Sequence, residues 1–396
     1  MSTMSAAATV ARTLDEVESL RPIWTSLPVP NIDAHIDYYL AVVRSSPQVL
    51  RPHVIHLPRE HGDLLVVARL VDQSFPLRLG YRTLGTIRAR TLLVSFDGIL
   101  GVETTEDRRV ALDLLREQLR AGEADVLVLQ KVEDGCALDL EFRATSSPLW
   151  QTTTPSVVRH RLTVPNSLYE LLESRPSRSR KRLRREMKLF DRDFKGRWSL
   201  KRIDAGGGTD QLTQDIDAVA AHSYQRHLGI GSVDEQVLHA LRDLALDRGW
   251  LRAWILYMDA APVAFWWGML HEGILEPGAT GFDPALRSSG VGFFTLMKML
   301  EDTCLDPDVK TVDFGYGEAD YKRRFASESS LHSDLLVFAA KPRAMAVRAA
   351  LLVNGAVVRA TTRLLERSGR VRSIRRRWRS LAHGPDAAAE GSAGGR

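Results

Sequence analysis

A glycine-containing loop that opens onto a helix constrains the fold of this chain more than any other stretch. Arg287, Gly290 and Gly292 have the spacing R-x-x-G-x-G, and residues 293–304 after them have helical periodicity. The glycines permit positive φ angles and a close approach of backbone to ligand. The free N–H groups and positive dipole end of such a helix form an anion site. Residues 309–314 then predict a short buried strand. A phosphate-bearing cofactor beside such a strand is the layout of a group-transfer enzyme.

The predicted cofactor-binding residues are consecutive positions of this loop. An arginine would supply charge to a phosphate, two serines would donate hydroxyl groups, and the last amides would point toward the ligand. The set is Arg287, Ser288, Ser289, Gly290, Val291 and Gly292. The spacing alone favours an ordinary turn with a helix N-cap, because glycine loops are common. The sequence downstream of the loop shifts the balance toward a cofactor site.

Two further motifs accompany the loop. The predicted strand leads into DFGYGEADYKRRF at residues 313–325, and a basic helix with the pattern K-x-L-R-R begins at Lys181. Together the three features resemble the GNAT acyltransferases, in which R/Q-x-x-G-x-G/A binds the pyrophosphate of acetyl-CoA. They resemble most closely the cellulose-biosynthesis (CelD-type) acetyltransferases, which are relatives of the Fem-type peptidoglycan aminoacyltransferases. The resemblance covers roughly residues 10–340.

The resemblance implies acyl transfer, which requires a base, an acid and an oxyanion donor. Glu318 and Asp313 are the candidate bases, directly or through water, and the Tyr321 phenol is suited to protonating the departing sulfur, as a tyrosine does in many GNAT enzymes. The alternative is that Asp313 caps its turn and Tyr321 packs its ring with Phe325. The candidate substrate-binding residues are Lys322, Arg323 and His222, the histidine lying on a helix predicted to line the acceptor cleft.

The order of predicted elements repeats along the chain, which indicates a duplicated α/β unit. The predicted fold is α/β (α+β), with tandem GNAT-like domains, each a mixed, mostly antiparallel sheet flanked by helices. We expect a disordered N-terminus at 1–12, a degenerate GNAT-like domain at 13–160, a catalytic GNAT-like domain at 161–340 and a basic helical tail at 341–396. The first half lacks the glycine loop. The equivalent segment ahead of its helix, residues 98–105, has acidic residues where phosphates would lie.

Composition bears on metal binding and on the cellular location of the protein. The two cysteines, Cys136 and Cys304, offer no disulfide or zinc framework, so we expect no metal. No apolar run approaches the roughly 20 residues of a spanning helix, and the N-terminus lacks the pattern of a signal peptide. We therefore expect a cytoplasmic protein, with possible peripheral binding to the inner face of the cell membrane.

Positive charge gathers in two segments, residues 175–188 and 341–379. The first lacks the interleaved aromatic residues of a nucleic-acid motif, so nucleic acid is not the expected partner. The second predicts an amphipathic cationic helix, which would lie on an anionic membrane or dock on the protein with its arginines outward.

The sequence therefore predicts an acyl-CoA-dependent N- or O-acyltransferase with acetyl-CoA as the default donor. The expected acceptor, by resemblance alone, is an amine or hydroxyl of a sugar or envelope-polysaccharide precursor. One alternative is a Fem-type transferase that uses aminoacyl-tRNA. The R-x-x-G-x-G loop argues against this alternative, because it matches a motif for CoA instead. Another is a non-catalytic scaffold associated with membrane or nucleic acid.

Overall fold

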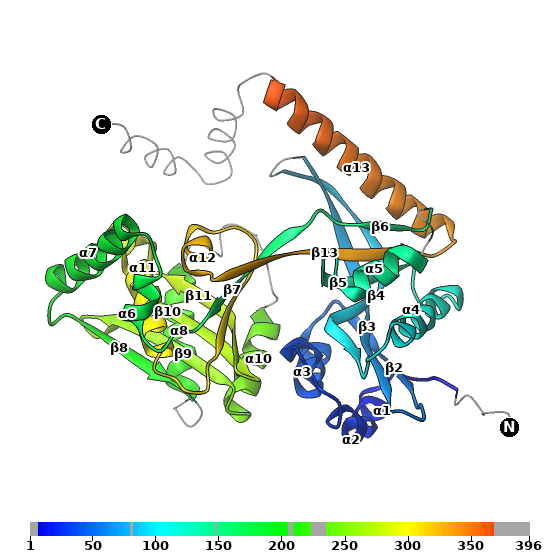
Figure 1. The fold of residues 1–396 in the computed structure, drawn as a ribbon, viewed down its shortest axis with the longest axis horizontal. Helices are drawn as coiled ribbons and strands as arrows, with labels where there is room; N and C mark the ends of the chain where they lie inside the picture. The colour runs from blue at the N-terminus through cyan, green and yellow to red at the C-terminus, as the bar shows by residue number, and fades with distance from the viewer. Residues whose placement is uncertain are drawn as a thin grey trace. The chain divides into compact units, whose positions relative to one another are not determined.

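A computed structural model describes residues 7–79, 82–145, 147, 149–204, 209–222 and 235–367 (Figure 1). Within it the chain forms two compact units, and neither is continuous in sequence. Unit 1 comprises residues 1–28, 47–154 and 334–396, and unit 2 comprises residues 29–46 and 155–333. The segment 29–46 precedes most of unit 1 in the chain but makes its contacts within unit 2.

Unit 1 is a sheet flanked by helices. Its strands follow the order β1-β2-β3-β4-β5-β13, with β6 pairing β13, and only β4 and β5 are parallel among the pairs described. Its elements are β1 (Thr9–Ala11), α1 (Leu14–Ser19), α2 (Arg21–Trp24), β2 (Val49–Leu57), β3 (Leu64–Leu79), β4 (Arg82–Leu100), α4 (Thr105–Arg120), β5 (Val126–Glu133), α5 (Ala137–Thr145), β6 (Gln151–Thr153), the end of β13 (Glu328–Phe338) and α13 (Pro342–Arg367).

The core of unit 1 follows from amphipathic patterns. Helix α4 turns Leu112, Leu115 and Leu119 toward the sheet, as its 3.6-residue periodicity predicts. These side chains pack on the apolar residues of β3, β4 and β5. The start of α13 joins this core through the buried residues Ala344 and Val347. None of the helices within the described ranges combines the length and the hydropathy needed to cross a bilayer.

The strands of unit 2 follow the order β13-β7-β12-β11-β10-β9-β8, in which only β11 and β12 are parallel among the pairs described. Its other elements are η1 (Ile32–Ala34), α3 (Ile36–Ser45), β7 (Val157–Thr163), α6 (Leu168–Glu173), α7 (Ser177–Asp193), β8 (Trp198–Ile203), α8 (Thr209–His222), α10 (Glu235–Asp247), β9 (Leu251–Met258), β10 (Ala261–His271), β11 (Ile274–Phe282), η2 (Pro284–Ser289), α11 (Val291–Thr303), β12 (Thr311–Tyr316) and α12 (Asp320–Phe325).

Helices cover both faces of the unit 2 sheet. Successive residues of a strand point to opposite faces, so Trp266 of β10 packs with α6, α7 and α11, whereas Phe265 and Trp267 pack with α3, α8 and α10. The residues on both faces are buried, which explains why β9 and β10 are nearly continuous apolar runs. The tryptophans of this hairpin are therefore core residues.

The predicted fold class is confirmed, because both units contain mostly antiparallel sheets with flanking helices, and they share a repeated order of elements. In unit 1, β4 leads through α4 to its parallel neighbour β5. In unit 2, β11 leads through α11 to its parallel neighbour β12. Pro176 is the N-cap residue of α7 and separates this helix from α6. Strand β7 and helices α5 and α12 were not predicted.

Candidate functional site

The N-terminus of α11 has no side-chain cap. Its N-cap residue is Gly290, with φ 77° and ψ 19°, and its first turn contains no acidic residue. The first N–H groups of a helix have no acceptor within the helix. A Cβ atom built on Gly290 would meet nothing within 4 Å, so there is space beside these N–H groups. An uncapped helix start with open space at its N-cap fits a phosphate group.

The corresponding helix of unit 1 shows the opposite arrangement. Helix α4 begins with a capping box in which Thr104 and Asp107 each accept from the other's backbone N–H group. Although burial alone would raise it, hydrogen bonds from the amides of Thr104 and Glu103 lower the pKa of Asp107 to about 2. The carboxylate therefore occupies the position that an anion would take. The predicted segment 98–105 contributes the Thr104 side chain and the Glu103 amide to this cap, whereas the capping carboxylate belongs to Asp107, which lies beyond that segment.

The six predicted cofactor-binding residues form a 3₁₀ helix followed by the start of α11. Arg287 and Ser288 lie exposed in η2, and the Ser289 hydroxyl donates to the Leu286 carbonyl over 2.5 Å rather than facing the helix start. Val291 is fully buried, so only its backbone is available to a ligand. A Cβ atom on Gly292 would lie 2.9 Å from Cδ1 of Phe282, so this position has no room for a side chain.

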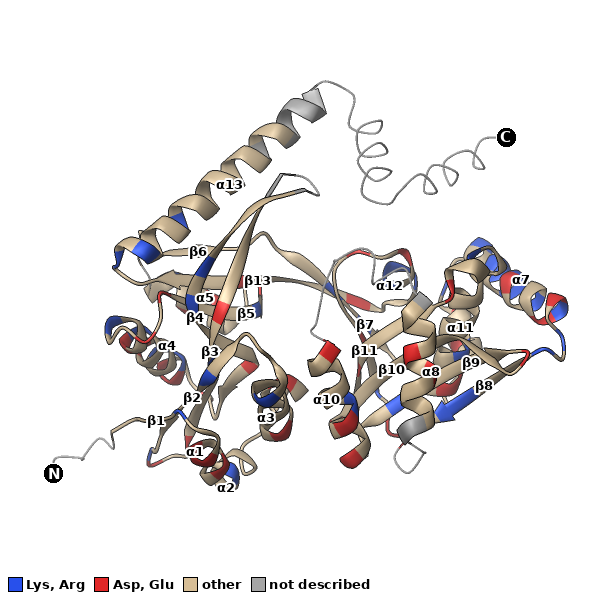
Figure 2. Ribbon diagram, turned by 180° about the vertical axis from the view of Figure 1, so that it is seen from behind, with Lys and Arg blue, Asp and Glu red and all other residues tan. Residues whose placement is uncertain are grey.

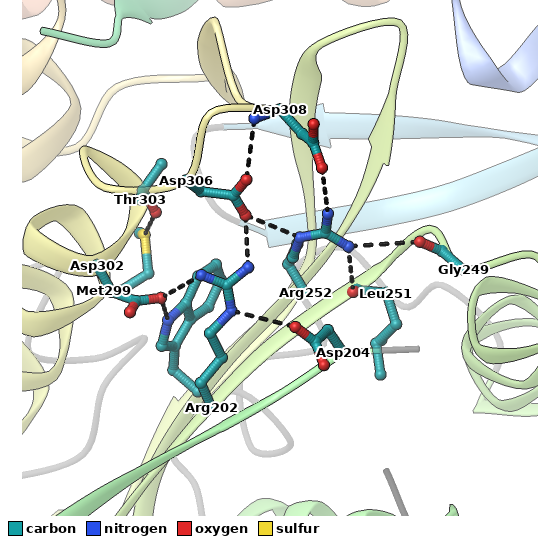
Figure 3. Close-up of polar contacts among 11 residues, drawn as sticks. Arg202, Asp204, Gly249, Leu251, Arg252, Met299, Asp302, Thr303, Asp306 and Asp308 are labelled. Atoms are coloured by element: carbon teal, nitrogen blue, oxygen red, sulfur yellow. Dashed lines mark hydrogen bonds and ion pairs between the residues drawn. The ribbon is translucent and has the colours of Figure 1, made fainter. Parts of the chain in front are cut away.

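An ion-pair network fixes the other end of α11 (Figure 3). Arg202 of β8 donates to Asp302 of α11 over 2.9 Å and to Asp306 over 2.5 Å. The Trp254 indole donates to the same Asp302 oxygen over 2.7 Å, and Arg252 of β9 donates to Asp306 over 3.0 Å. Burial alone would raise the pKa of Asp306, but its bonds to Arg252, Asp308 and Arg202 lower it. The network holds α11 against β8 and β9.

The parallel strands beside α11 separate after two residue pairs. β11 and β12 pair only at Ile274–Thr311 and Leu275–Val312, although both strands continue. Beyond this point their facing backbone groups are not paired to each other. Aromatic side chains largely fill the space, since a cavity of only about 10 Å³ remains beside Leu275, Val312 and Phe314. A thioester arm would have to displace side chains there.

Tyr321 lies at this point of separation. Its ring makes edge-to-face contacts with Trp266 at 5.7 Å and Phe314 at 5.9 Å between centroids. Burial raises the pKa of its phenol, so the hydroxyl keeps its proton at neutral pH. The ring is packed as the alternative expected, but its edge-to-face partners are Trp266 and Phe314 instead of Phe325, and this packing leaves the phenol available as a proton donor.

Asp313 is held by two arginines of β7. Its Oδ2 atom accepts from Nε of Arg159 over 2.6 Å and from Nε of Arg161 over 3.0 Å. Its Oδ1 atom accepts from the Gly315 amide over 2.7 Å, which is the turn-capping contact expected as the alternative to a base. Asp313 is 2% exposed. These contacts are typical of a fixed ion pair rather than of a carboxylate that exchanges protons with a substrate.

Glu276 is a candidate base that the sequence did not indicate. It lies on β11, one residue beyond the last pair with β12, and its side chain is 21% exposed. Burial, together with the nearby Asp33 and Asp313 carboxylates, raises the pKa of Glu276 to about 8, against the opposing effect of Arg159 and Arg161. Its Oε1 atom lies 3.5 Å from Nη2 of Arg159. A carboxylate with a pKa near neutrality is suited to general-base catalysis.

The remaining predicted residues lie around α12. Glu318 is half exposed and lies 3.3 Å from Arg323 and 3.9 Å from Nε2 of His160. The Lys322 ammonium donates to the Tyr316 carbonyl over 2.7 Å, and burial lowers its pKa. Arg323 is exposed and also pairs with Asp320. His222 ends α8, and its side chain lies outside the described residues.

The basic helix predicted around Lys181 is α7 (Figure 2). Several of its exposed cations recur every three or four residues, which places these on one face. Within the described part of the chain, four of them have no carboxylate partner, namely Arg178, Lys181, Arg185 and Lys188. The buried Leu183 and Phe190 join this helix to the same side of the sheet as α11.

Comparison with known proteins shows a family to which this part of the chain is similar. Residues 177–323 match the family described as acetyltransferase (GNAT) domain. No curated protein sequence matches the chain significantly.

Three solved structures share the fold over most of the chain. FemX is 11% identical with a TM-score of 0.52, covering 81% of this chain and 96% of its own. A conserved protein of unknown function from Bacteroides thetaiotaomicron is 10% identical with a TM-score of 0.52, covering 83% and 100%. The C-terminal domain of a protein assigned as a lysylphosphatidylglycerol synthetase from Agrobacterium fabrum is 13% identical with a TM-score of 0.51, covering 86% and 96%.

These likenesses extend through both units, and at such identities they establish fold alone. The match to residues 177–323 contains the loop, α11, β12 and Tyr321. None of these comparisons identifies the cellulose-biosynthesis type, which stays a prediction. Residues 177–323 match a domain of the GNAT acetyltransferase superfamily.

Proposed function

We propose that the protein is an acyl-CoA-dependent N- or O-acyltransferase, with acetyl-CoA as the default donor. One observation carries this proposal: the uncapped start of α11 follows β11 through the 3₁₀ helix η2, and β11 separates from β12 at Glu276. A helix start suited to a phosphate group and a point where two parallel strands separate are then joined by a single short segment. The match of residues 177–323 to an acetyltransferase domain supports the same reaction.

The loop residues would bind the donor. The first amides of α11 and the side chain of Arg287 would hold phosphate groups, while the absence of a side chain at Gly290 keeps the helix start accessible. The fixed C-terminal end of α11 keeps these amides in position relative to β8 and β9. When bound, the donor supplies an activated acyl group.

Two residues would move the protons. Glu276 would accept the proton of the acceptor amine or hydroxyl, since its raised pKa suits a base near neutral pH. Tyr321 would donate its phenolic proton to the leaving thiolate. Asp313 would act by holding Arg159 and Arg161, which in turn face Glu276. Glu318 stays an alternative base, because its exposed carboxylate can reach solvent and substrate.

The acceptor class rests on the sequence resemblance. A sugar or envelope-polysaccharide precursor would present amines and hydroxyls, and Lys322, Arg323 and His222 are the residues proposed to meet it. The exposed Arg323 suits an anionic precursor.

A second candidate is aminoacyl transfer from tRNA. The unpaired cations on one face of α7 favour it, because such a face binds a phosphate backbone. In that case α7, rather than the start of α11, would hold the donor.

A donor comparison separates the two functions. The purified protein is incubated with acetyl-CoA or with aminoacyl-tRNA, each with a panel of amino sugars and neutral sugars, and free CoA or deacylated tRNA is measured. We expect CoA release that depends on an acceptor and is lost in Glu276→Gln but kept in Glu272→Gln, an exposed glutamate in the preceding turn. Turnover of aminoacyl-tRNA with no CoA release would establish the second candidate instead.

A further inference from the structure

A cavity of about 540 Å³ opens within unit 1, away from every residue assigned above. It lies where the C-terminal ends of α4 and α5 meet β6 and the end of β13. Its volume lies within the range of about 300–1,000 Å³ typical of small-molecule sites. The residues that matter to its chemistry are Arg116, Leu119, Arg120, Trp150, Gln151 and Lys341.

The wall of the cavity is cationic. Three of its lining residues carry positive charge and none is acidic. Arg116 is fixed in place, because its guanidinium donates to Asp113 and Thr145 over 2.8 Å each. Arg120 and Lys341 are exposed and have no carboxylate partner among the residues that the structure describes. Two such cations around one concavity raise the local concentration of an anion.

The opposite part of the wall is apolar and aromatic. Leu119, Val337 and the buried Phe338 line it, and the Trp150 ring is 38% exposed beside them. The backbone at Trp150 is held by hydrogen bonds, since its N–H donates to Ser147 over 3.0 Å and its carbonyl accepts from Phe338 over 2.7 Å. An indole held in a cavity wall offers a face for a flat ring.

Gln151 adds an acceptor that lacks its donor. Its Oε1 atom is buried, and no described residue donates a hydrogen bond to it. A buried carbonyl without a donor destabilises the protein, so a ligand N–H group would relieve that cost once the Gln151 side chain turned its oxygen toward the cavity. The three features require an anionic group, a flat ring and an N–H donor in one small molecule.

We propose that this cavity binds a nucleoside monophosphate or an organic anion of that size and shape. The phosphate pairs with Arg120 and Lys341, the base stacks on Trp150, and an exocyclic amine of the base donates to Gln151. The site belongs to the unit that lacks the phosphate loop, and its existence does not depend on the acyltransferase proposal.

Calorimetric titration of adenosine 5′-monophosphate into the full chain tests the site, with adenosine and inorganic phosphate as separate probes. We expect saturable binding of the monophosphate that quenches tryptophan fluorescence, and weaker binding of either fragment. The double variant Arg120→Ala, Lys341→Ala should weaken binding by about tenfold or more. Arg108→Ala, on the same helix but outside the cavity, should leave it unchanged.

A further variant separates this site from the loop of unit 2. Gly290→Asp, which places a carboxylate at the start of α11, should bind the monophosphate as the unaltered chain does. Absence of saturable binding to the unaltered chain would overturn the proposal. Equal binding by the double variant and Arg108→Ala would overturn it as well, and loss of binding in Gly290→Asp would place the monophosphate at the loop.

Discussion

The Nε atom of Arg159 lies 2.6 Å from the Oδ2 atom of Asp313, and both side chains are buried. This pair joins β7 to β12, two strands separated in sequence by most of unit 2. Arg159 also lies 3.5 Å from Glu276 on β11. The pair therefore determines the charge around the proposed base without itself having to exchange protons.

Replacing Asp313 by asparagine should destabilise the protein strongly. The change leaves the buried Arg159 without its anionic partner, and breaking a buried ion pair from one side costs about 3–5 kcal/mol. Urea denaturation followed by circular dichroism would measure the free energy of unfolding. Asp320→Asn is the matched control, because that aspartate is exposed and its pair with Arg323 should contribute little. Equal stabilities for the two variants would contradict the structural role given to Asp313.

The pH dependence of turnover should report Glu276. Because burial raises the pKa of its carboxyl to about 8, the base form grows as pH rises, and kcat/KM for CoA release should increase with an apparent pKa near 8. Glu276→Gln should lower kcat/KM and remove this rise. Glu272→Gln should keep the profile of the unaltered protein. An unchanged pH profile in Glu276→Gln would shift the assignment to Glu318.

Glu276 should also make stability depend on pH, and in the opposite direction: turnover rises with pH, whereas the free energy of unfolding falls. A carboxyl whose pKa is higher in the folded state than its usual 4.5 favours folding while protonated, and this contribution is lost as pH rises from 4.5 through about 8. The unfolding free energy of the unaltered protein should therefore fall relative to that of Glu276→Gln between pH 5 and pH 9. Thermal melts of both proteins at these pH values would measure it. A constant difference would show that Glu276 titrates normally.

Tyr321→Phe should separate chemistry from packing. The phenylalanine ring keeps the contacts with Trp266 and Phe314, so the melting temperature should change little. Loss of the phenolic proton should lower kcat by about 10²-fold with little change in KM, as expected for removal of a general acid. Steady-state kinetics across acyl donors would measure both parameters. A variant with full kcat would show that Tyr321 only packs.

The network at the end of α11 should lose its contribution in acid. Ion pairs hold the pKa of Asp306 below the ordinary 3.8, so its stabilisation is present above 3.8 and is lost as pH falls through the folded-state pKa. Asp306→Asn should therefore flatten the dependence of unfolding free energy on pH below 4. Asp308→Asn is the control, since that side chain is largely exposed. If the unfolding free energies of the two variants depended on pH in the same way below pH 4, the stabilising role given to the Asp306 carboxylate would be wrong.

The parts of the site that could be predicted from the sequence are those encoded locally. The glycine loop, α11 and β12 follow one another along the chain, and hydrophobic periodicity and glycine spacing indicate them directly. The boundaries differ by a residue or two, and the 3₁₀ helix η2 takes the place of an open loop. The capped start of α4, in contrast to the uncapped start of α11, also follows from residues next to it in sequence, since Thr104 and Asp107 form its capping box.

The parts that were missed depend on contacts distant in the chain. β7 carries Arg159, His160 and Arg161 in the middle of a strand, and these charged residues hide its hydrophobic pattern. The burial of Arg159 makes sense only when Asp313 of β12 faces it, and His160 instead bonds to Ser329 of β13. Glu276 likewise looks like an ordinary polar residue of β11. Its raised pKa arises from Asp33, Asp313 and the surrounding burial, none of which a local window contains.

Binding of the acyl donor at the start of α11 is the central claim, and one titration tests it most directly. Gly290→Asp suits this position because nothing lies within 4 Å of the new Cβ atom and aspartate tolerates positive φ. Its charge would repel a phosphate, and Gly290→Asn supplies the same shape without the charge. Acetyl-CoA is titrated calorimetrically into the unaltered protein and both variants. We predict that the unaltered protein and Gly290→Asn bind, and that Gly290→Asp binds at least about tenfold more weakly. No binding by the unaltered protein, or equal binding by the two variants, would contradict the claim.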